Sequence, residues 1–423
     1  MAELHPNDIG LAAFNDVGDV SALQTTAKVV VAAINELNAV AIKNYIVNGT
    51  GVKHVNASAT ALGTSASALG QSCTANGSYA FSAGISCTAS TTAAIALGGY
   101  CTASGTYTFA CGYYCQATSS YAHAEGYYCY AQNSAAHAEG YQCYATGAYS
   151  HAEGQNCYAQ NQAAHAQGYY CYATGYYAHA GGMYTKARYC QTVIGRYNVN
   201  SAASDTAYNA AYEAFLIGNG TSDSARANCF KVTYAGNCST NGSFSSPAGD
   251  YAEYFEWKDK NKNKEDRAGR FVKLEKGKIV FAEDLTDVLG VISAVPAIIG
   301  DSAEFNWKGK FLTDDFGRVQ YHDVIVPAEY SEDGELMREE TQERQPILNP
   351  DFDPSAPYVP RKDRTEWDAV GVIGKLTVYD DGTCESGDLC RPTVGGGATK
   401  STTKKGYCVI KRMAADKILI WVR

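Results

Sequence analysis

Small side chains alternate with larger ones through much of the first half of the chain, and the alternation itself recurs every fourteen residues. In one unit the small residues are Ala122, Ala124 and Gly126; the pattern then skips a position and resumes at Cys129 and Ala131. A period of two indicates a β-strand with one buried face, and the skipped position indicates a turn. Each unit is therefore predicted to form two short strands around an interior that admits only Ala, Gly, Ser and Cys. A helix is excluded because no helical stripe of apolar residues appears.

The fourteen-residue interval predicts a solenoid, in which each coil stacks only on its neighbours. Nine glycines mark the interval, and eight cysteines keep step with the first eight of them. The glycines are Gly70, Gly84, Gly98, Gly112, Gly126, Gly140, Gly154, Gly168 and Gly182, and the cysteines are Cys73, Cys87, Cys101, Cys115, Cys129, Cys143, Cys157 and Cys171. With coils about 4.8 Å apart, the repeats would form a shaft on the order of 40 Å long.

An interior this thin buries little apolar area per coil and leaves strand edges open, so several chains are expected to pack side by side. Repeats such as Ser150-His-Ala-Glu-Gly154 resemble the left-handed β-roll heads of trimeric autotransporter adhesins, over residues from about 56 to 190. The resemblance implies a mainly β fold, a left-handed parallel β-roll solenoid that assembles as a homotrimer. Cysteine stands where that family more often has Ala, Ser or Thr.

The repeat cysteines, which belong to a total of fifteen, are predicted to face the interior. Cysteines one coil apart are within disulfide reach on distance alone, but stacking in register points their Cβ atoms the same way. We therefore expect free thiols that act as small buried hydrophobes. Disulfides along the axis or between chains, and bound metal, are the alternatives. The chain has no CxxC pair with zinc-finger spacing.

A second ladder has the opposite parity to the alanines and is predicted to face outward, with Glu125, Glu139 and Glu153 on the same face. It consists of His123, His137, His151, His165 and His179. In a lone roll these residues would form a solvated polar stripe. In a trimer they could face the threefold axis, where rings of histidines could bind metal or anions. A tyrosine ladder (Tyr130, Tyr144, Tyr158 and Tyr172) is expected to stack, with glycan contact as the alternative.

The N-terminal segment, residues 1–50, is expected to attach the protein to a larger particle. Residues 20–45 are predicted to form a helix, because Leu23, Val30 and Leu37 recur every seven residues. A coiled-coil collar and a single amphipathic helix remain open, and the stretch resembles N-terminal segments of phage tail-fibre proteins. We find no basic region followed by an apolar run that would indicate a signal peptide, and no apolar run long enough to cross a membrane.

The composition changes near residue 250, after a shaft predicted over 51–195 and a connector over 196–249. The C-terminal part, residues 250–423, holds most of the charged residues and all four tryptophans. β-Branched runs over 370–378 and 408–423 predict a mainly β globular domain. The proline-rich segment 332–364 is predicted to be irregular. The net charge of −9 favours a soluble assembly and argues against a nucleic-acid partner.

The sharpest local motif is Phe244-Ser-Ser-Pro-Ala-Gly-Asp-Tyr-Ala-Glu-Tyr-Phe-Glu-Trp257, at the start of this domain. It is similar to the start of the C-terminal intramolecular chaperone domain of phage appendage and tail-fibre proteins. The similarity continues through segments 288–296, 309–317 and 371–375, and so spans roughly 240 to 423. The resemblance implies a domain that helps three chains to register and fold. It also implies that the domain then cuts itself off by autoproteolysis of the glutamic-peptidase type.

The resemblance places the cut at the Gly249–Asp250 bond, with Asp250 and Glu253 as the catalytic carboxylates. Two carboxyls near one amide can divide the roles of general acid and base if burial separates their pKa values. Serine is expected before the aspartate in cleaved members, and Gly249 stands there instead. The alternative is that both carboxylates only cap or bridge the domain entrance.

Other catalytic schemes have less support in the sequence. The only histidine after residue 250 is His322, which could pair with Cys384, Cys390 or Cys408 as a nucleophile. The Ser-Asp-x-Arg-Leu-Lys motif of self-cleaving endosialidase-type tailspikes is absent from the sequence. Any activity is therefore expected to be a single self-cleavage that needs no cofactor.

We therefore hypothesise a homotrimeric phage tail-fibre or appendage protein, made in the host cytoplasm and located on the virion. Its expected partners are other virion or baseplate proteins, bound through the N-terminus, and a host surface glycan or protein. We expect no nucleic-acid partner and no insertion into a membrane. The alternatives are a bacterial surface or injection-system adhesin and a glycan-degrading tailspike enzyme.

Overall fold

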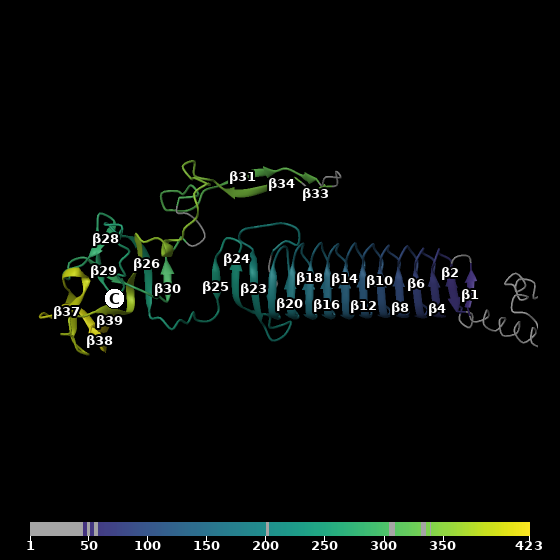
Figure 1. Ribbon diagram of the computed structural model, residues 1–423, viewed down its shortest axis with the longest axis horizontal. Coiled ribbons are helices and arrows are strands. Elements are labelled where there is room, and N and C mark those ends of the chain that lie inside the picture. The colour runs from purple at the N-terminus through teal and green to yellow at the C-terminus, as the bar shows by residue number, and fades with distance from the viewer. Residues whose placement is uncertain are drawn as a thin grey trace, which may run out of the picture. The chain divides into compact units, whose positions relative to one another are not determined.

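The protein divides into two compact units, residues 1–244 and 245–423, in a computed structural model (Figure 1). The structure describes residues 45–48, 51–54, 58–199, 203–303, 309–330, 336–338 and 340–423. Regular structure in these residues consists of strands and two 3-10 turns, η4 (Arg361–Asp363) and η5 (Val394–Gly396), which confirms the prediction of a mainly β protein. The helix predicted over 20–45 falls outside the described residues, except that Tyr45 begins a strand.

Each coil of the first unit contributes one five-residue strand and one two-residue strand, as the skipped position in the repeat predicts. The longer strands are β4 (Ser67–Gln71), β6 (Phe81–Ile85), β8 (Ile95–Gly99), β10 (Phe109–Tyr113), β12 (His123–Tyr127), β14 (His137–Tyr141), β16 (His151–Gln155), β18 (His165–Tyr169), β20 (His179–Met183) and β22 (Thr192–Arg196). The shorter ones are β3 (Thr60–Ala61), β5 (Thr74–Ala75), β7 (Thr88–Ala89), β9 (Thr102–Ala103), β11 (Gln116–Ala117), β13 (Tyr130–Ala131), β15 (Tyr144–Ala145), β17 (Tyr158–Ala159), β19 (Tyr172–Ala173) and β21 (Lys186–Ala187).

Both strand sets pair in parallel with their own kind along the shaft, and equivalent residues of successive coils face each other. On the longer strands His123 pairs with His137, and Gly126 pairs with Gly140. The interior is a stack of Ala and Cys side chains with at most 1% of their surface exposed, as predicted. The unit is thus a parallel β-solenoid with a core of small side chains.

The longer-strand sheet continues beyond the repeats at both ends. An antiparallel pair, β1 (Tyr45–Asn48) and β2 (Gly51–His54), precedes β4. At the other end β23 (Glu213–Asn219) adds in parallel to β22, and β24 (Asn228–Thr233) and β25 (Cys238–Thr240) follow antiparallel. Much of the predicted connector, 196–249, therefore belongs to the solenoid sheet.

The second unit is built on a ten-stranded, largely antiparallel sheet. Its strands are β26 (Asp250–Glu256), β27 (Phe271–Glu275), β28 (Lys278–Phe281), β29 (Val288–Ile292), β30 (Ile298–Gly300), β35 (Trp367–Tyr379), β36 (Leu389–Pro392), β37 (Ala398–Lys400), β38 (Tyr407–Ala414) and β39 (Lys417–Val422). The two predicted β-branched runs form most of β35 and the pair β38–β39. Large apolar side chains such as Phe271, Val378 and Ile418 fill the core.

Two further hairpins lie in the part of the chain between β30 and β35. One pairs β31 (Tyr321–Val326) with β34 (Thr341–Pro346), and the other pairs β32 (Glu329–Tyr330) with β33 (Leu336–Arg338). The segment 332–364, which we predicted to be irregular, therefore includes two strands. Its prolines cluster after Thr341, and β34 ends at the first of them, Pro346.

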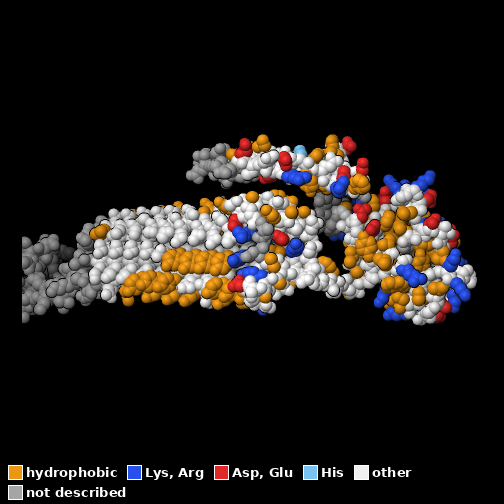
Figure 2. All heavy atoms as spheres, turned by 180° about the vertical axis from the view of Figure 1, so that it is seen from behind, with side chains coloured by type: hydrophobic (Ala, Val, Ile, Leu, Met, Phe, Trp, Pro, Cys, Tyr) orange, Lys and Arg blue, Asp and Glu red, His pale blue; other side chains and the backbone are white. Residues whose placement is uncertain are grey.

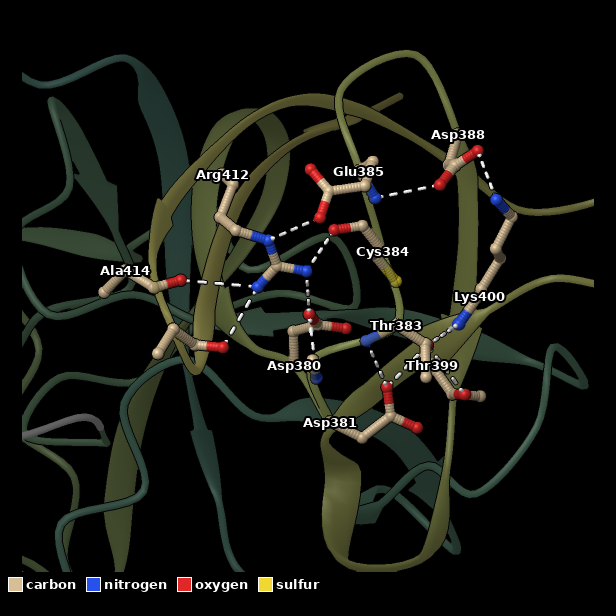
Figure 3. Close-up of polar contacts among 12 residues, drawn as sticks. Asp380, Asp381, Thr383, Cys384, Glu385, Asp388, Thr399, Lys400, Arg412 and Ala414 are labelled. Atoms are coloured by element: carbon tan, nitrogen blue, oxygen red, sulfur yellow. Dashed lines mark hydrogen bonds and ion pairs between the residues drawn. The ribbon is translucent and has the colours of Figure 1, made fainter.

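A buried ion pair ties the end of β35 to β38 and β39 (Figure 3). The Arg412 guanidinium lies 2.7 Å from Oδ2 of Asp380, whose side chain is wholly buried. The same guanidinium donates hydrogen bonds to the carbonyl oxygens of Cys384, Ala414 and Ala415. A buried charge is tolerated when it is paired and hydrogen-bonded in this way. This cluster therefore holds the loop after β35 against the β38–β39 turn.

Candidate functional site

The Gly249–Asp250 bond lies in the second unit, at the very start of β26. This strand lies between two others: it runs antiparallel to β35, where Asp250 faces Gly374, and parallel to β30, where Tyr251 faces Ile298. The bond predicted to be cut therefore lies directly before the first residue of a strand that is paired on both sides.

The carbonyl group of the candidate scissile bond accepts a hydrogen bond from the opposite strand. The backbone N–H of Lys375 donates to the Gly249 oxygen over 3.0 Å, and the N–H of Ala297 donates to the Asp250 oxygen over 2.9 Å. Gly374 has a φ of 118°, and a Cβ there would lie 2.2 Å from the Gly249 oxygen. Only glycine lets the two backbones approach this closely, so Gly374 is needed for the hydrogen bond from the Lys375 N–H to the Gly249 oxygen.

Asp250 is buried, with 6% of its surface exposed. Its Oδ2 atom has no hydrogen-bond partner among the described residues. A Cβ placed on Gly371 would lie 3.0 Å from this oxygen and 2.6 Å from the Leu376 side chain. A buried polar atom left unpaired costs free energy, and such atoms call for an explanation in a folded protein. A reactive role for this carboxyl would supply one.

Glu253 is oriented by Tyr251, which lies on the same face of β26. Side chains alternate along β26, so Asp250 and Glu253, three residues apart, point to opposite faces. The Tyr251 hydroxyl donates a hydrogen bond to Oε1 of Glu253 over 2.6 Å, and this bond raises the pKa of Tyr251. Gly300 leaves room for the pair, since a Cβ there would lie 2.7 Å from the Tyr251 hydroxyl oxygen. Within one chain the structure therefore does not bring the two predicted carboxylates together.

A cavity of about 330 Å³ adjoins the bond and is lined by Gly249, Asp250, Lys375, Tyr379 and Lys417, among others. This volume is room for on the order of ten water molecules. The side chain of Lys375 also lies beside Gly249: a Cβ built at Gly249 would be 3.4 Å from its Cβ, an ordinary contact. The serine expected from the family resemblance would therefore fit where this chain has glycine.

The histidine ladder lies on the outer face of the shaft, as the repeat parity predicts. The histidines alternate with buried alanines and present their rings outward, with centroids of successive rings 4.5–4.8 Å apart. Partial burial, followed by the neighbouring histidines, lowers the pKa of His137 and His165. The predicted tyrosine ladder is stacked as well, at 4.7–5.1 Å. Figure 2 shows stripes of hydrophobic side chains, a class that includes Tyr, along one face of the shaft.

Two of the three candidate cysteine nucleophiles have unfavourable surroundings, while the third, Cys408, is exposed. Cys384 and Cys390 lie in the apolar core, and burial raises the pKa of Cys390 to about 12. A thiol of this kind is inert because the thiolate is the nucleophile. His322 is exposed on β31, where it pairs with Gln345 of β34.

Sequence reasoning missed Lys375, Gly374, Tyr251 and Gly300 as parts of the site. The segment 371–375 carried part of the family resemblance, but nothing in the sequence connects it to Gly249, more than a hundred residues earlier. Only the pairing of β26 with β35 and β30 brings these residues together.

Comparison with known families and proteins gives a match to Peptidase_G2, described as an IMC autoproteolytic cleavage domain, over residues 194–415. The match begins well before the boundary at 250 that we predicted. It includes the strands β23–β25 of the first unit and the whole of the candidate site.

Three curated relatives are similar over parts of the chain. The preneck appendage protein of Bacillus phage PZA is 37% identical over 150 residues, which are 36% of this chain and 16% of the relative. The pre-neck appendage protein of Bacillus phage phi29 is 36% identical over 172 residues, 38% of this chain and 18% of that one. The putative phage-related protein YobO of Bacillus subtilis is 35% identical over 43% of this chain. The chain thus spans about a fifth or less of the length of these relatives.

Two solved structures are also similar. One is the C-terminal fragment of bacteriophage phi29 gene product 12, with 32% identity, a TM-score of 0.32, and coverage of 41% of this chain and 100% of the fragment. The other is pre-mature phi29 gene product 12, with 20% identity, a TM-score of 0.38, and coverage of 86% of this chain and 39% of that one.

Proposed function

The chain belongs to the Peptidase_G2 family of IMC autoproteolytic cleavage domains, and we propose that it is a phage structural protein that cuts itself once, between Gly249 and Asp250. The main observation in support of this proposal is the position of that bond and the groups that surround it. It stands at the start of a strand, with its carbonyl oxygen held by the Lys375 amide and an unpaired, buried carboxyl on its amine side. The relatives named as appendage proteins favour a virion protein over the adhesin and tailspike alternatives.

The proposed reaction is hydrolysis of one amide bond. Water from the adjoining cavity attacks the Gly249 carbonyl carbon while a carboxylate takes its proton. Negative charge develops on the Gly249 oxygen, where the Lys375 N–H stabilises it in the manner of an oxyanion hole. The C–N bond then breaks, the Asp250 nitrogen gains a proton from a carboxylic acid, and the products are a carboxylate at Gly249 and an amine at Asp250. In this scheme Asp250 is the acid, because its side chain belongs to the leaving amine.

The base is Glu253, and its orientation makes the reaction depend on assembly. Because Glu253 points to the face of β26 opposite Asp250, one chain alone does not supply both groups. We propose that three copies associate and that Glu253 of a neighbouring copy approaches the bond. Cleavage then follows only correct assembly. In this proposal the second unit guides trimer formation, the solenoid remains on the particle for attachment to the host surface, and the N-terminus binds other virion proteins.

The test is the intact mass of the full-length protein during refolding. We expect a fragment comprising residues 250–423 to appear, and Asp250→Asn and Glu253→Gln to slow its appearance at least 100-fold. Glu283→Gln, at an exposed position on the same unit, is the matched control and should cut at the parental rate. Normal cutting by the Asp250 and Glu253 variants would refute the carboxylate assignment.

Assembly is tested separately by light scattering on the uncut Asp250→Asn protein. A mass three times that of the chain is expected. Mixing Asp250→Asn with Glu253→Gln chains before refolding then tests the shared site, because each mixed trimer contains one bond that keeps both groups. A monomer, or no fragment from the mixture, would contradict the proposed assembly-dependent cut.

A further inference from the structure

The outward histidine ladder brings three metal-ligand side chains together on two adjacent coils. His137 and Glu139 are two residues apart on β14 and so share its outer face, and His151 is the register partner of His137 on β16. One ligand atom from each of the three lies within 4.8 Å of the other two. Nε2 of His137 is 3.8 Å from Oε2 of Glu139.

The imidazole of His151 carries an unused nitrogen in this cluster. Its Nε2 atom, like those of His165 and His179, is buried and has no hydrogen-bond partner in the part of the chain that the structure describes. Of these three histidines, His151 is the one that lies in a cluster with a second histidine and a carboxylate. A ring nitrogen in this state is a lone pair or an N–H removed from water without compensation. A cation bound by the lone pair would remove that cost.

Neighbouring carboxylates on the ladder are already engaged, which singles out Glu139. Glu125 lies 3.3 Å from Nε2 of His123, the residue next to it on the outer face of its own strand. Glu153 accepts a hydrogen bond from the Gln167 amide over 3.3 Å. Two coils further on, glycine replaces the carboxylate residue at Gly181. The ladder therefore combines two histidines and a loosely held carboxylate on two adjacent coils.

We propose that His137, Glu139 and His151 of a single chain bind one divalent transition-metal ion, of which Zn²⁺ is the simplest case. Two imidazole nitrogens and one carboxylate oxygen are a ligand set that suits zinc, with water in the fourth position. The site is independent of the proposed cleavage, which concerns the other unit. It also differs from a ring at a threefold axis, because its ligands come from successive coils of one chain.

The ligands must close slightly around the ion. The His137 and His151 rings are parallel, with an interplanar angle of 1° and centroids 4.6 Å apart. Ligand atoms about 2.1 Å from a tetrahedral ion are roughly 3.4 Å from one another. The rings reach this separation by turning toward each other about χ2, which is a broad torsion in histidine. The side chains of His137 and Glu139 are 36% and 52% exposed, so solvent leaves room for this movement.

The experiment is a zinc titration of the full-length protein, stripped with chelator and followed by isothermal calorimetry. Cys238→Ser and Cys408→Ser form the background, because these are the exposed thiols of the described residues. One ion per chain is expected, and Glu139→Gln and His151→Ala should each weaken binding at least tenfold. His179→Ala removes a ladder histidine away from the cluster and should leave the affinity unchanged.

Cobalt(II) absorption provides the second readout, since it distinguishes nitrogen and oxygen ligands from thiolates. All of the substituted side chains lie on the outer face, so circular dichroism of each variant should match the parent. No binding by the parent, equal affinity in Glu139→Gln, or one ion per three chains would each overturn the proposal.

Discussion

At the scale of single residues, backbone contact between coils explains the fourteen-residue glycine interval. Gly126, Gly140 and Gly154 all have φ values between 106° and 113°. A Cβ on any of them would lie about 2.1 Å from a carbonyl oxygen of the next coil. The recurrence visible in the sequence is therefore a close approach of backbones, repeated once per coil.

Gly140→Ala should destabilise the shaft by about 2 kcal/mol or more, because it adds a clash with the Gly154 oxygen at 2.1 Å to the strain of a positive φ. Two other positions separate these causes. Gly236→Ala has a positive φ but open space around it and should cost about 1 kcal/mol. Gly181→Ala has neither problem and should be nearly neutral. Denaturant unfolding measures all three, and equal effects would contradict the explanation.

Arg267 makes the second unit sensitive to acid. Its buried guanidinium lies 4.3 Å from the centre of the Trp257 ring and pairs with Asp259 and Glu265. Hydrogen bonds from Arg267 lower the pKa of both carboxyls in the folded state. Groups with a lowered folded pKa stabilise the fold above their unfolded pKa, near 4, and lose that contribution as the pH falls further.

We therefore expect the stability of this unit to fall as the pH drops below about 4, with a smaller fall in Arg267→Leu. Urea unfolding followed by tryptophan fluorescence between pH 3 and 7 measures the free energy of unfolding of this unit. Lys404→Leu, which removes an exposed positive charge elsewhere on the unit, is the control for net charge. If the free energy of unfolding fell as steeply with decreasing pH in Arg267→Leu as in the parent, this cause would be ruled out.

At the scale of elements, local periodicity predicted the strands that obey it and missed those that do not. The Ala and Cys positions faced inward and the histidines outward as predicted, because alternation fixes the face of a strand. The strands β23–β25 lie in a stretch without the repeat, where only the pairing of β23 with β22, and of each later strand with the one before it, identifies them. The environment of Asp250 was equally hidden, because β35 is distant in sequence.

Gly374→Ala should slow the proposed cleavage at least tenfold, because the added Cβ would push the Lys375 amide away from the Gly249 oxygen. Gly382→Ala is the matched control, since Gly382 also has a positive φ but contacts nothing closer than 4.0 Å. The rate of fragment formation by mass spectrometry is the measurement. If the fragment formed at equal rates in the two variants, the Lys375 N–H would have no part in the reaction. The proposed cleavage before Asp250 would still stand, because the fragment forms.

At the scale of the molecule, the two units have chemically different cores. The first is a column of Ala and Cys, whereas the second contains large apolar side chains and Trp257. All four tryptophans of the chain lie in the second unit. Tryptophan fluorescence therefore reports the second unit alone, while circular dichroism reports both.

We expect two separate unfolding transitions in the uncut Asp250→Asn protein, with only one of them seen by tryptophan fluorescence. Independent units unfold at different midpoints when their cores differ, and each should respond to its own substitutions. Gly140→Ala should move the transition that fluorescence does not detect, and Arg267→Leu the other. A single transition that is coincident by both probes would show instead that the units unfold together.

The parallel register of the coils has a mechanical consequence. The hydrogen bonds between coils run along the shaft, so a pull on its two ends loads them one coil at a time. Each coil that peels away would release fourteen residues, or about 45 Å of extended chain, in place of a rise of about 5 Å. Stretching a single molecule should then give evenly spaced steps of roughly 40 Å at low force. A shaft built this way would lengthen under tension instead of breaking at once.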